Sequence, residues 1–313
     1  MQHIPVALER CIALLTPALE KSNSPIVVDA TLGMGGHSKA LLERFPRLKI
    51  IGLDRDLSAI AIAAERLNSV SDRVVIVHAV YDEIATVLAN LGIPAVEGIL
   101  FDLGVSSMQL DQAQRGFAYS QEAPLDMRMD QSTGPTAYEV LHTYNHGQLA
   151  RILQRYGEEK FASKIAENII KARSTNSLNT TKELAEIVKE SIPAPARRTG
   201  GNPAKRTFQA LRIEVNQELT ILERAIPAAI ESLVVSGRLV VMAYQSLEDK
   251  IVKRAFVKVT ASGTPRGLPV ELPGSAAKFA FVIRGSESAT DAEIAINPRA
   301  QSMRLRAIER LAA

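Results

Sequence analysis

A glycine-rich turn that follows an apolar run is the feature that most constrains this fold. Residues 27–38 read Val-Val-Asp-Ala-Thr-Leu-Gly-Met-Gly-Gly-His-Ser, and Gly52-Leu53-Asp54 closes the next apolar run. This order predicts a buried strand, a turn that opens a helix, and a second strand that ends in a carboxylate. Glycines let the backbone approach a nucleotide-like ligand at a helix N-terminus, and an acid at the tip of the second strand holds a ribose in doubly wound folds. We therefore expect an adenosine-containing cofactor.

Apolar runs alternate with amphipathic segments through the first third of the chain. The runs predict strands at 26–29, 48–54, 74–78 and 98–104, and the other segments predict helices at 6–20, 36–44, 58–67 and 82–91. Short apolar strands separated by helices are typical of a parallel sheet that is covered on both faces. The predicted fold class is therefore α/β, with a Rossmann-like sheet.

The alternation stops near residue 108 and resumes near residue 212. Between them, loops rich in Arg, Asp, Met and Pro are followed by helical patterns at 148–156, 161–171 and 181–191. The later pattern predicts a long helix at 209–233, strands at 238–244 and 279–283, a helix at 247–256, a surface loop at 261–277 and a basic helix at 302–311. We therefore predict a sheet domain formed by 1–108 and 213–313, interrupted by a mainly helical insert at 109–212 that recognises the substrate.

Composition and charge restrict the functions open to this chain. Its 313 residues include one cysteine, Cys11, which excludes an intrachain disulfide and an all-cysteine metal site, and no metal is predicted. The sequence shows neither an export signal nor an apolar stretch of about 18 residues, so we expect a cytoplasmic protein without membrane association. The net charge is only +3, and a site for a polyanion must therefore come from local clustering of cations.

The spacing of the glycines distinguishes between cofactor classes. A nicotinamide-binding turn has the pattern G-x-G-x-x-G, but Ser38 stands at the position of the third glycine, and the Gly-Lys-Ser/Thr of a triphosphate cradle is absent. A compact D-x-x-x-G-x-G-G turn suits S-adenosylmethionine better, because this ligand has no pyrophosphate to neutralise. Asp54 would accept hydrogen bonds from both ribose hydroxyls, and Tyr81 would pack against the adenine. Asp102 would lie in the crevice at the carboxyl end of the fourth strand.

Further motifs are spread over almost the full length of the chain. They are His3-Ile4-Pro5-Val6, the turn at 29–38, Asp102-Leu103-Gly104-Val105-Ser106-Ser107-Met108-Gln109-Leu110-Asp111, Arg115-Gly116-Phe117, the segments 124–130 and 206–216, Ser246-Leu247-Glu248-Asp249 and Asn297-Pro298-Arg299. In this combination the chain resembles the bacterial small-subunit ribosomal RNA cytosine-N4 methyltransferases, the RsmH or MraW family.

The resemblance implies a fold, a reaction and a set of cofactor contacts. The fold is the class I S-adenosylmethionine-dependent methyltransferase sheet with its helical insert. The reaction is methylation of the exocyclic N4 of a cytidine in the decoding (P-site) region of 16S ribosomal RNA in the small ribosomal subunit. The implied contacts to S-adenosylmethionine are Gly35, Gly36, His37, Asp54, Tyr81, Asp102 and Gln109.

Two positions depart from the family pattern. Tyr81 stands where a phenylalanine is usual, which preserves the aromatic face. Ala243-Tyr244-Gln245 precedes the Ser-Leu-Glu-Asp motif where Phe-His is more familiar, so no histidine is available there. We interpret this position as one that lines the site without supplying the base.

Methyl transfer to an exocyclic amine needs positioning and an acceptor for the N–H. Asp102 is the predicted catalytic residue for this task, and the alternative for it is a contact to the cofactor. Asp126 and Asp130 are weaker candidates, for which a solvated loop is the competing interpretation. Methylation at carbon 5 would require a cysteine thiolate, and Cys11 on an amphipathic helix reads as a buried core residue.

A cluster of cations is the predicted contact to RNA. Arg197, Arg198, Lys205, Arg206 and Arg212 lie in a stretch without an acid that also contains Phe208, a candidate for stacking on a base. A second cluster consists of Arg299, Arg304, Arg306 and Arg310. The competing interpretation of both clusters is a solvated face. The target base must also be splayed from its stack.

Three other functions remain open at this point. They are an amino methyltransferase acting on another nucleic acid or a small molecule, a nicotinamide dehydrogenase, and a non-catalytic ribosome assembly factor. Binding of S-adenosylmethionine or of NADH distinguishes between them. The sequence leaves the oligomeric state open between monomer and homodimer.

Overall fold

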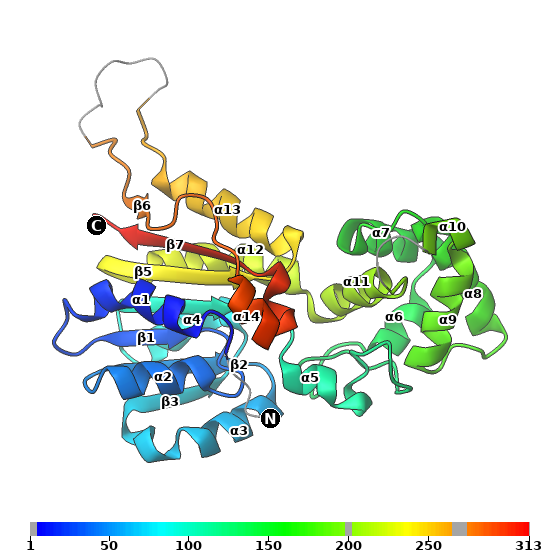
Figure 1. Ribbon diagram of the computed structural model, residues 1–313, viewed down its shortest axis with the longest axis horizontal. Helices are drawn as coiled ribbons and strands as arrows, with labels where there is room; N and C mark the ends of the chain where they lie inside the picture. Colours follow the sequence, from blue (N-terminus) through cyan, green and yellow to red (C-terminus); the bar gives the residue numbers. More distant parts are fainter. Residues whose placement is uncertain (1–4, 198–201, 265–273, 313) are drawn as a thin grey trace. The chain divides into compact units, whose positions relative to one another are not determined.

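The computed structural model describes residues 5–197, 202–264 and 274–312, and the chain divides into two compact units (Figure 1). The sheet unit is formed by Met1–Gly104 and Leu219–Ala313, and the helical unit by Val105–Glu218. The sequence placed the insert at 109–212, so the helical unit extends a few residues further at each end. Part of the predicted surface loop at 261–277 lies outside the described residues, and so does Arg198.

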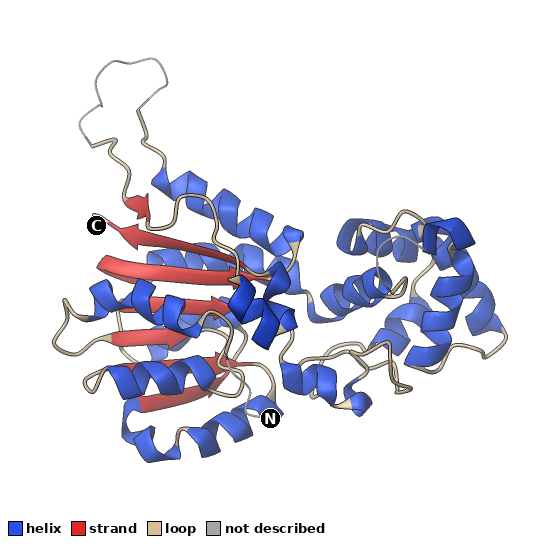
Figure 2. Cartoon of the chain, viewed as in Figure 1, coloured by secondary structure: helices blue, strands red, loops and turns tan. Residues whose placement is uncertain are grey.

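The sheet unit holds, within the described residues, a seven-stranded sheet ordered β3-β2-β1-β4-β5-β7-β6 (Figure 2). The strands are β1 (Ile26–Asp29), β2 (Lys49–Asp54), β3 (Val74–His78), β4 (Val96–Asp102), β5 (Leu233–Ala243), β6 (Phe279–Phe281) and β7 (Arg304–Arg310). The first five run parallel, and β7 lies antiparallel between β5 and β6. The predicted Rossmann-like α/β class is confirmed.

Helices cover both faces of this sheet because its strands are apolar on both sides. One face packs against α1 (Leu8–Leu19), α2 (Gly36–Arg44) and α3 (Leu57–Arg66), and the other against α4 (Ile84–Asn90), α12 (Glu218–Glu231) and α13 (Ser246–Thr260). Shorter elements are η1 (Asn68–Arg73), η2 (Tyr81–Glu83), α14 (Asp291–Ile296) and η4 (Pro298–Ser302). Val27, Val28 and Leu100 are fully buried at the centre, which makes β1 and β4 a rigid base for the loops that follow them.

The prediction of a basic helix at 302–311 was wrong, because this segment forms β7. Its arginines look like a solvated helical face in the sequence, but Arg304, Arg306 and Arg310 have hydrogen-bond partners elsewhere in the sheet unit. Arg306 is buried and forms a two-pronged ion pair with Asp249 at 2.7 and 2.9 Å. Arg310 donates to the carbonyl oxygen of Leu233 at 2.6 Å. The second cationic cluster is therefore largely engaged within the protein.

The prediction of one long helix at 209–233 was also wrong. The chain forms α11 (Lys205–Asn216) and then α12, and Gln217 between them adopts a left-handed conformation with φ 50°. A non-glycine residue in this region ends a helix, and no proline or glycine signals the break. β5 begins at Leu233, earlier than the predicted 238, because Ser236 with φ 67° lets the strand continue through an irregular pairing with β4.

The helical unit has a core of its own. Its elements are α5 (Ser107–Asp111), η3 (Ala113–Arg115), α6 (Ala137–Thr143), α7 (His146–Gly157), α8 (Ala162–Ser174), α9 (Thr181–Ser191), α10 (Ala194–Arg197) and α11. The buried Arg115 donates to the carbonyl oxygens of Arg128 and Met129, and Asn216 bonds Met127 and Met129, so the loop before α6 is tied to α11. The helical patterns at 148–156, 161–171 and 181–191 are confirmed. No helix in the described ranges is long and apolar enough to cross a membrane.

Candidate active site

Three loops lie together at the edge of the sheet that is formed by the carboxyl ends of β2, β1 and β4. β1 lies between β2 and β4, so the order of the strands reverses at β1, and ligands of such sheets bind at the carboxyl ends of the strands beside this point. The glycine-rich turn follows β1, Asp54 ends β2 and Asp102 ends β4. The three features singled out in the sequence therefore meet at one edge of the sheet unit.

A buried acid at the end of β1 holds the glycine-rich turn in place. Gly33 and Gly35 have φ values of 53° and 74°, and Gly35 is the N-cap of α2. Asp29 is buried at the end of β1, where it accepts a hydrogen bond from the Ser38 hydroxyl at 2.6 Å. Burial raises the pKa of Asp29 above its ordinary value. Ser38, which breaks the nicotinamide pattern, thus ties α2 to β1.

Asp54 is held by two backbone amides. Its Oδ2 accepts from the amide of Gly33 at 2.7 Å, and its Oδ1 accepts from the amide of Asp56 at 2.8 Å. Burial raises the pKa of Asp54 to about 6, although both amide bonds favour the charged form. A carboxylate has about four lone-pair positions, so further acceptor capacity remains on both oxygens. These free acceptor positions fit a ligand that donates from two neighbouring hydroxyls.

Tyr81 and the first residues of α2 complete the edge. The Tyr81 ring packs edge-on against Phe101, with ring centres 5.6 Å apart and planes at 76°. A Cβ on Gly36 would come within 2.6 Å of the Pro5 ring, so this position needs glycine for close packing. His37 is 7% exposed, and its Nε2 lies 3.0 Å from the carbonyl oxygen of Val6. The N-terminal segment therefore packs directly onto the turn.

Asp102 is fixed from two neighbouring strands. Its amide donates to the Thr31 hydroxyl at 2.6 Å, which joins it to the turn after β1. Its Oδ1 accepts from the Tyr244 hydroxyl at 2.7 Å, and its Oδ2 lies 4.0 Å from His37 Nδ1. Burial and the adjacent carboxylate raise the pKa of Tyr244 far above its ordinary value, so the phenol stays protonated.

The pairing of Tyr244 with Asp102 was not predicted from the sequence, in which Tyr244 stands out only as the residue that replaces a histidine. The signal was nevertheless present, because Tyr244 is the last residue of the predicted strand at 238–244, and the carboxyl ends of adjacent parallel strands meet. Cys11 is 1% exposed, with its Sγ 3.7 Å from Met242 Sδ, and burial raises its thiol pKa strongly. A thiolate nucleophile is therefore disfavoured.

The predicted RNA contacts of the helical unit divide into two groups. Arg197, Lys205 and Arg206 are exposed, and Arg206 donates to the carbonyl oxygen of Glu158 at 3.0 Å. Phe208 is 4% exposed and packs edge-on against Tyr119 in the core. The stacking role predicted for Phe208 is therefore not retained.

Two further predicted contacts have structural partners in the helical unit. Arg212 forms a two-pronged pair with the buried Glu218 at 2.8 and 2.9 Å, so it secures the end of α11. Gln109, predicted to contact the cofactor, forms a capping box with Ser106 at the start of α5. Its side-chain oxygen accepts from the Ser106 amide at 3.1 Å. This bond explains why a glutamine stands at that position in the motif.

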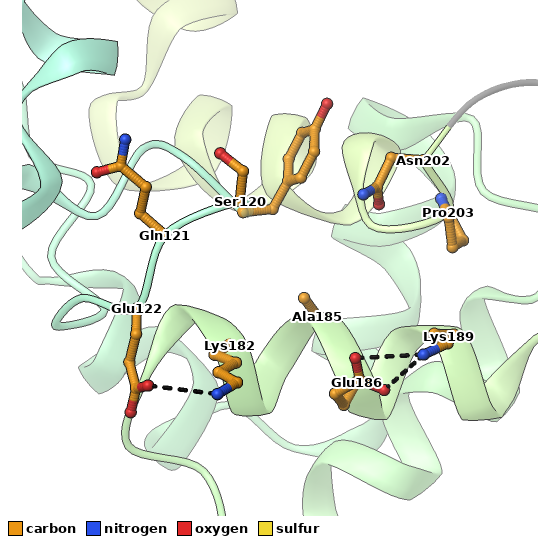
Figure 3. Close-up of a pocket in the computed structure, with 10 residues that line it drawn as sticks. Ser120, Gln121, Glu122, Lys182, Ala185, Glu186, Lys189, Asn202 and Pro203 are labelled. Carbon is orange, nitrogen blue, oxygen red and sulfur yellow. Dashed lines mark hydrogen bonds and ion pairs between the residues drawn. The ribbon is translucent and has the colours of Figure 1, made fainter.

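An open hollow of about 440 Å³ lies in the helical unit, between the 119–122 loop, α9 and residues 202–203 (Figure 3). Two lysines and two glutamates line it in pairs, with Lys182 at 3.6 Å from Glu122 and Lys189 at 3.0 Å from Glu186. Its charge is balanced, so it is no cradle for a phosphate. Among the described residues, no three histidine, cysteine or acidic side chains are grouped to hold a metal ion.

Comparisons with known proteins agree with this geometry. Residues 1–311 match the model of the MraW methylase family. The "Ribosomal RNA small subunit methyltransferase H" of Salinispora tropica is 57% identical over 312 residues, covering 99% of this chain and 84% of that protein. The protein of the same name from Renibacterium salmoninarum is 54% identical, covering 99% of this chain and 95% of that protein.

A solved structure with a related description is similar only distantly. It is an rRNA methylase from Streptococcus thermophilus, which is 12% identical with a TM-score of 0.45 and covers 99% of both chains. The fold assignment here therefore depends on the strand order of the sheet itself and on the family match. On that match and on the relatives above, the chain belongs to the MraW methylase family, and is an S-adenosylmethionine-dependent methyltransferase.

Proposed function

We propose that this methyltransferase modifies the exocyclic N4 of a cytidine in the decoding (P-site) region of 16S ribosomal RNA. The curated relatives are named for the RNA of the small ribosomal subunit, which supports that substrate. The observation that supports N4 as the target atom is the Asp102 carboxylate at the end of β4, which accepts a hydrogen bond from the Tyr244 hydroxyl. The buried thiol of Cys11 argues against carbon 5 as the target.

The residues at the edge of the sheet are suited to hold S-adenosylmethionine. Asp54 would accept from the two ribose hydroxyls, Tyr81 would flank the adenine, and the turn with Gly35 and Gly36 would let the backbone approach the ligand. His37, Asp102 and Gln109 are the other proposed contacts. When bound, the cofactor supplies a methyl group that its sulfonium has already activated.

The task left to the protein is to prepare the acceptor nitrogen. The lone pair of the cytosine N4 is delocalised into the ring, so the free amine is a poor nucleophile. A hydrogen bond from N4–H to the Asp102 carboxylate would return electron density to nitrogen and hold it in line. The carboxylate would then accept the proton that nitrogen loses as the N–C bond forms. The helical unit would bind the surrounding RNA in the cytoplasm.

The decisive experiment is transfer of labelled methyl groups to small ribosomal subunits that lack this modification, followed by nucleoside mass spectrometry. We expect N4-methylcytidine in 16S ribosomal RNA. Methylcytidine of another kind, or label only in a different nucleic acid, would contradict the proposed target. Cofactor binding without any transfer would favour a role in subunit assembly.

The affinity for S-adenosylmethionine should fall in mild acid. Burial raises the pKa of Asp54 to about 6, above the ordinary 3.8, so the free protein takes up a proton there as the pH falls. The ligand hydroxyls need the ionised carboxylate, so affinity is full above pH 6 and declines below it. We expect a Kd about tenfold weaker at pH 5 than at pH 7.5. Titration calorimetry on protein shown to be folded at both values measures this, and a constant Kd would contradict it.

Replacement of Lys205 and Arg206 by alanine should weaken RNA binding and leave cofactor affinity intact. Both side chains are exposed cations at the start of α11. Loss of two phosphate contacts should lower affinity for the rRNA by about tenfold and reduce its salt dependence. Lys171→Ala, an exposed lysine on α8, is the control and should bind as the wild type does. Filter binding at several salt concentrations measures the affinity for rRNA and its salt dependence. Equal affinity of the wild type, the double variant and Lys171→Ala would refute this role.

A further inference from the structure

The contact between Tyr244 and Asp102 joins the ends of two paired strands. Asp102 is in register with Met242 on β5, and Tyr244 is the first residue beyond β5. The phenol donates to Asp102 Oδ1 at 2.7 Å, which is a short bond of the kind that an ionised acceptor makes. Residues 142 positions apart are thereby linked where the proposed methyl acceptor would bind.

The two oxygens of this carboxylate face different neighbours. Oδ1 is engaged on the β5 side by the phenol. Oδ2 lies 4.0 Å from His37 Nδ1 on the β1 side, which is too far for a hydrogen bond. The Thr31 hydroxyl fixes the backbone of Asp102 but not the rotation of its side chain. The phenol is thus a fixed hydrogen-bond donor that orients the Asp102 carboxylate from the β5 side.

Tyr244 is itself well anchored. Its amide donates at 3.0 Å to Oε2 of the buried Glu248, in the first turn of α13. A Cβ on Gly104 would lie 3.8 Å from the ring, so the phenol rests against the backbone that follows β4. Both ends of the residue are thus constrained, and its hydroxyl is a fixed donor.

We propose that Tyr244 is a positioning residue for methyl transfer, which holds the Asp102 carboxylate in the orientation that receives the acceptor N–H. This inference rests on the proposed role of Asp102 and deepens it. The hydroxyl touches neither the cofactor nor the base in this proposal and acts through Asp102 alone. The methyl-transfer step should therefore depend on Tyr244 while cofactor binding does not.

The test is Tyr244→Phe, which keeps the ring and removes the donor. We expect kcat to fall by about 10- to 100-fold, as for loss of one hydrogen bond to a charged group, with the Kd and KM for S-adenosylmethionine within about twofold of the wild type. Tyr144→Phe is the matched control, because the Tyr144 hydroxyl donates to Glu214 at 2.6 Å in the helical unit. That variant should keep its kcat, although it loses the same kind of bond.

Combination with Asp102→Ala identifies the path of the effect. Because this variant leaves no acceptor for the phenol, Tyr244→Phe should change its residual rate of methyl transfer by less than about twofold if the phenol acts through the carboxylate. A full additional loss there overturns the proposal, as does an unchanged kcat in the single variant or a parallel loss of cofactor affinity.

The outcome is separable from that of the proposed function. A methylated product other than N4-methylcytidine would contradict the target, yet the ratio of kcat values would still test Tyr244. If the wild type transfers no methyl group, the proposal is tested instead by comparing the Asp102 side chain in crystal structures of the wild type and of Tyr244→Phe. We expect the Asp102 carboxylate to turn in the variant, and an unchanged orientation overturns the proposal.

Discussion

Asp102→Ala should abolish methyl transfer, with kcat lowered by about 10³-fold or more, which is in the range for removal of a group that handles a proton. Asp102 ends β4, and its carboxylate accepts a hydrogen bond from the Tyr244 hydroxyl. Asp102→Asn keeps the shape and can still accept from the phenol, but its weaker acceptor should lower kcat by about 100-fold. Single-turnover transfer to small subunits at saturating cofactor measures both rates.

The same variants decide between the two roles considered for Asp102. If the residue serves the acceptor nitrogen, the Kd for S-adenosylmethionine should change little while kcat collapses. A rise in Kd that matches the loss of rate would assign Asp102 to the cofactor instead. Wild-type turnover by Asp102→Ala would remove the residue from the mechanism. Asp72→Ala, an exposed acid after α3, is the control for loss of charge and should leave kcat unchanged.

Asp54→Ala should weaken binding of S-adenosylmethionine by about 100-fold or more, since two hydrogen bonds to a charged acceptor are lost. Asp54→Asn should weaken binding of S-adenosylmethionine nearly as much. The two carboxylate oxygens accept from the amides of Gly33 and Asp56, so an amide NH₂ in either place would face a backbone N–H. Titration calorimetry at pH 7.5 measures each Kd.

A matched acid on the next helix provides the control for Asp54. Glu65 is exposed on α3, and Glu65→Ala should bind the cofactor as the wild type does. Melting curves of the free proteins show whether the turn still forms in each variant. Cofactor affinity retained by a folded Asp54→Ala protein would place the ribose elsewhere.

The cofactor edge could be predicted because its signals are local. The turn with Gly33 and Gly35 and the acids that end β2 and β4 lie within apolar runs whose strand character is plain. Parallel topology then brings the strand ends together without knowledge of any distant contact. Helical spacing of apolar residues likewise predicted α7, α8 and α9 of the helical unit.

The parts that could not be predicted depend on partners distant in the chain. Arg306 reads as a surface cation until Asp249 neutralises it in the sheet. Phe208 reads as a stacking residue until the core of the helical unit encloses it. The left-handed Gln217 gives no signal of its own, because glutamine is an ordinary helix residue. For Arg306 and Phe208, a tertiary contact decided between two interpretations that the local sequence allowed.

The packing of α1 has a consequence for how this enzyme folds. The helix packs against β5, which lies more than 200 positions later in the chain. Arg238 donates to the carbonyl oxygen of Leu14 across 224 positions, and Cys11 meets Met242 across 231. Contacts between such distant parts form slowly, because a long loop must close first. The segment before α1, which packs onto the cofactor turn, is therefore fully secured only after β5 has joined the sheet.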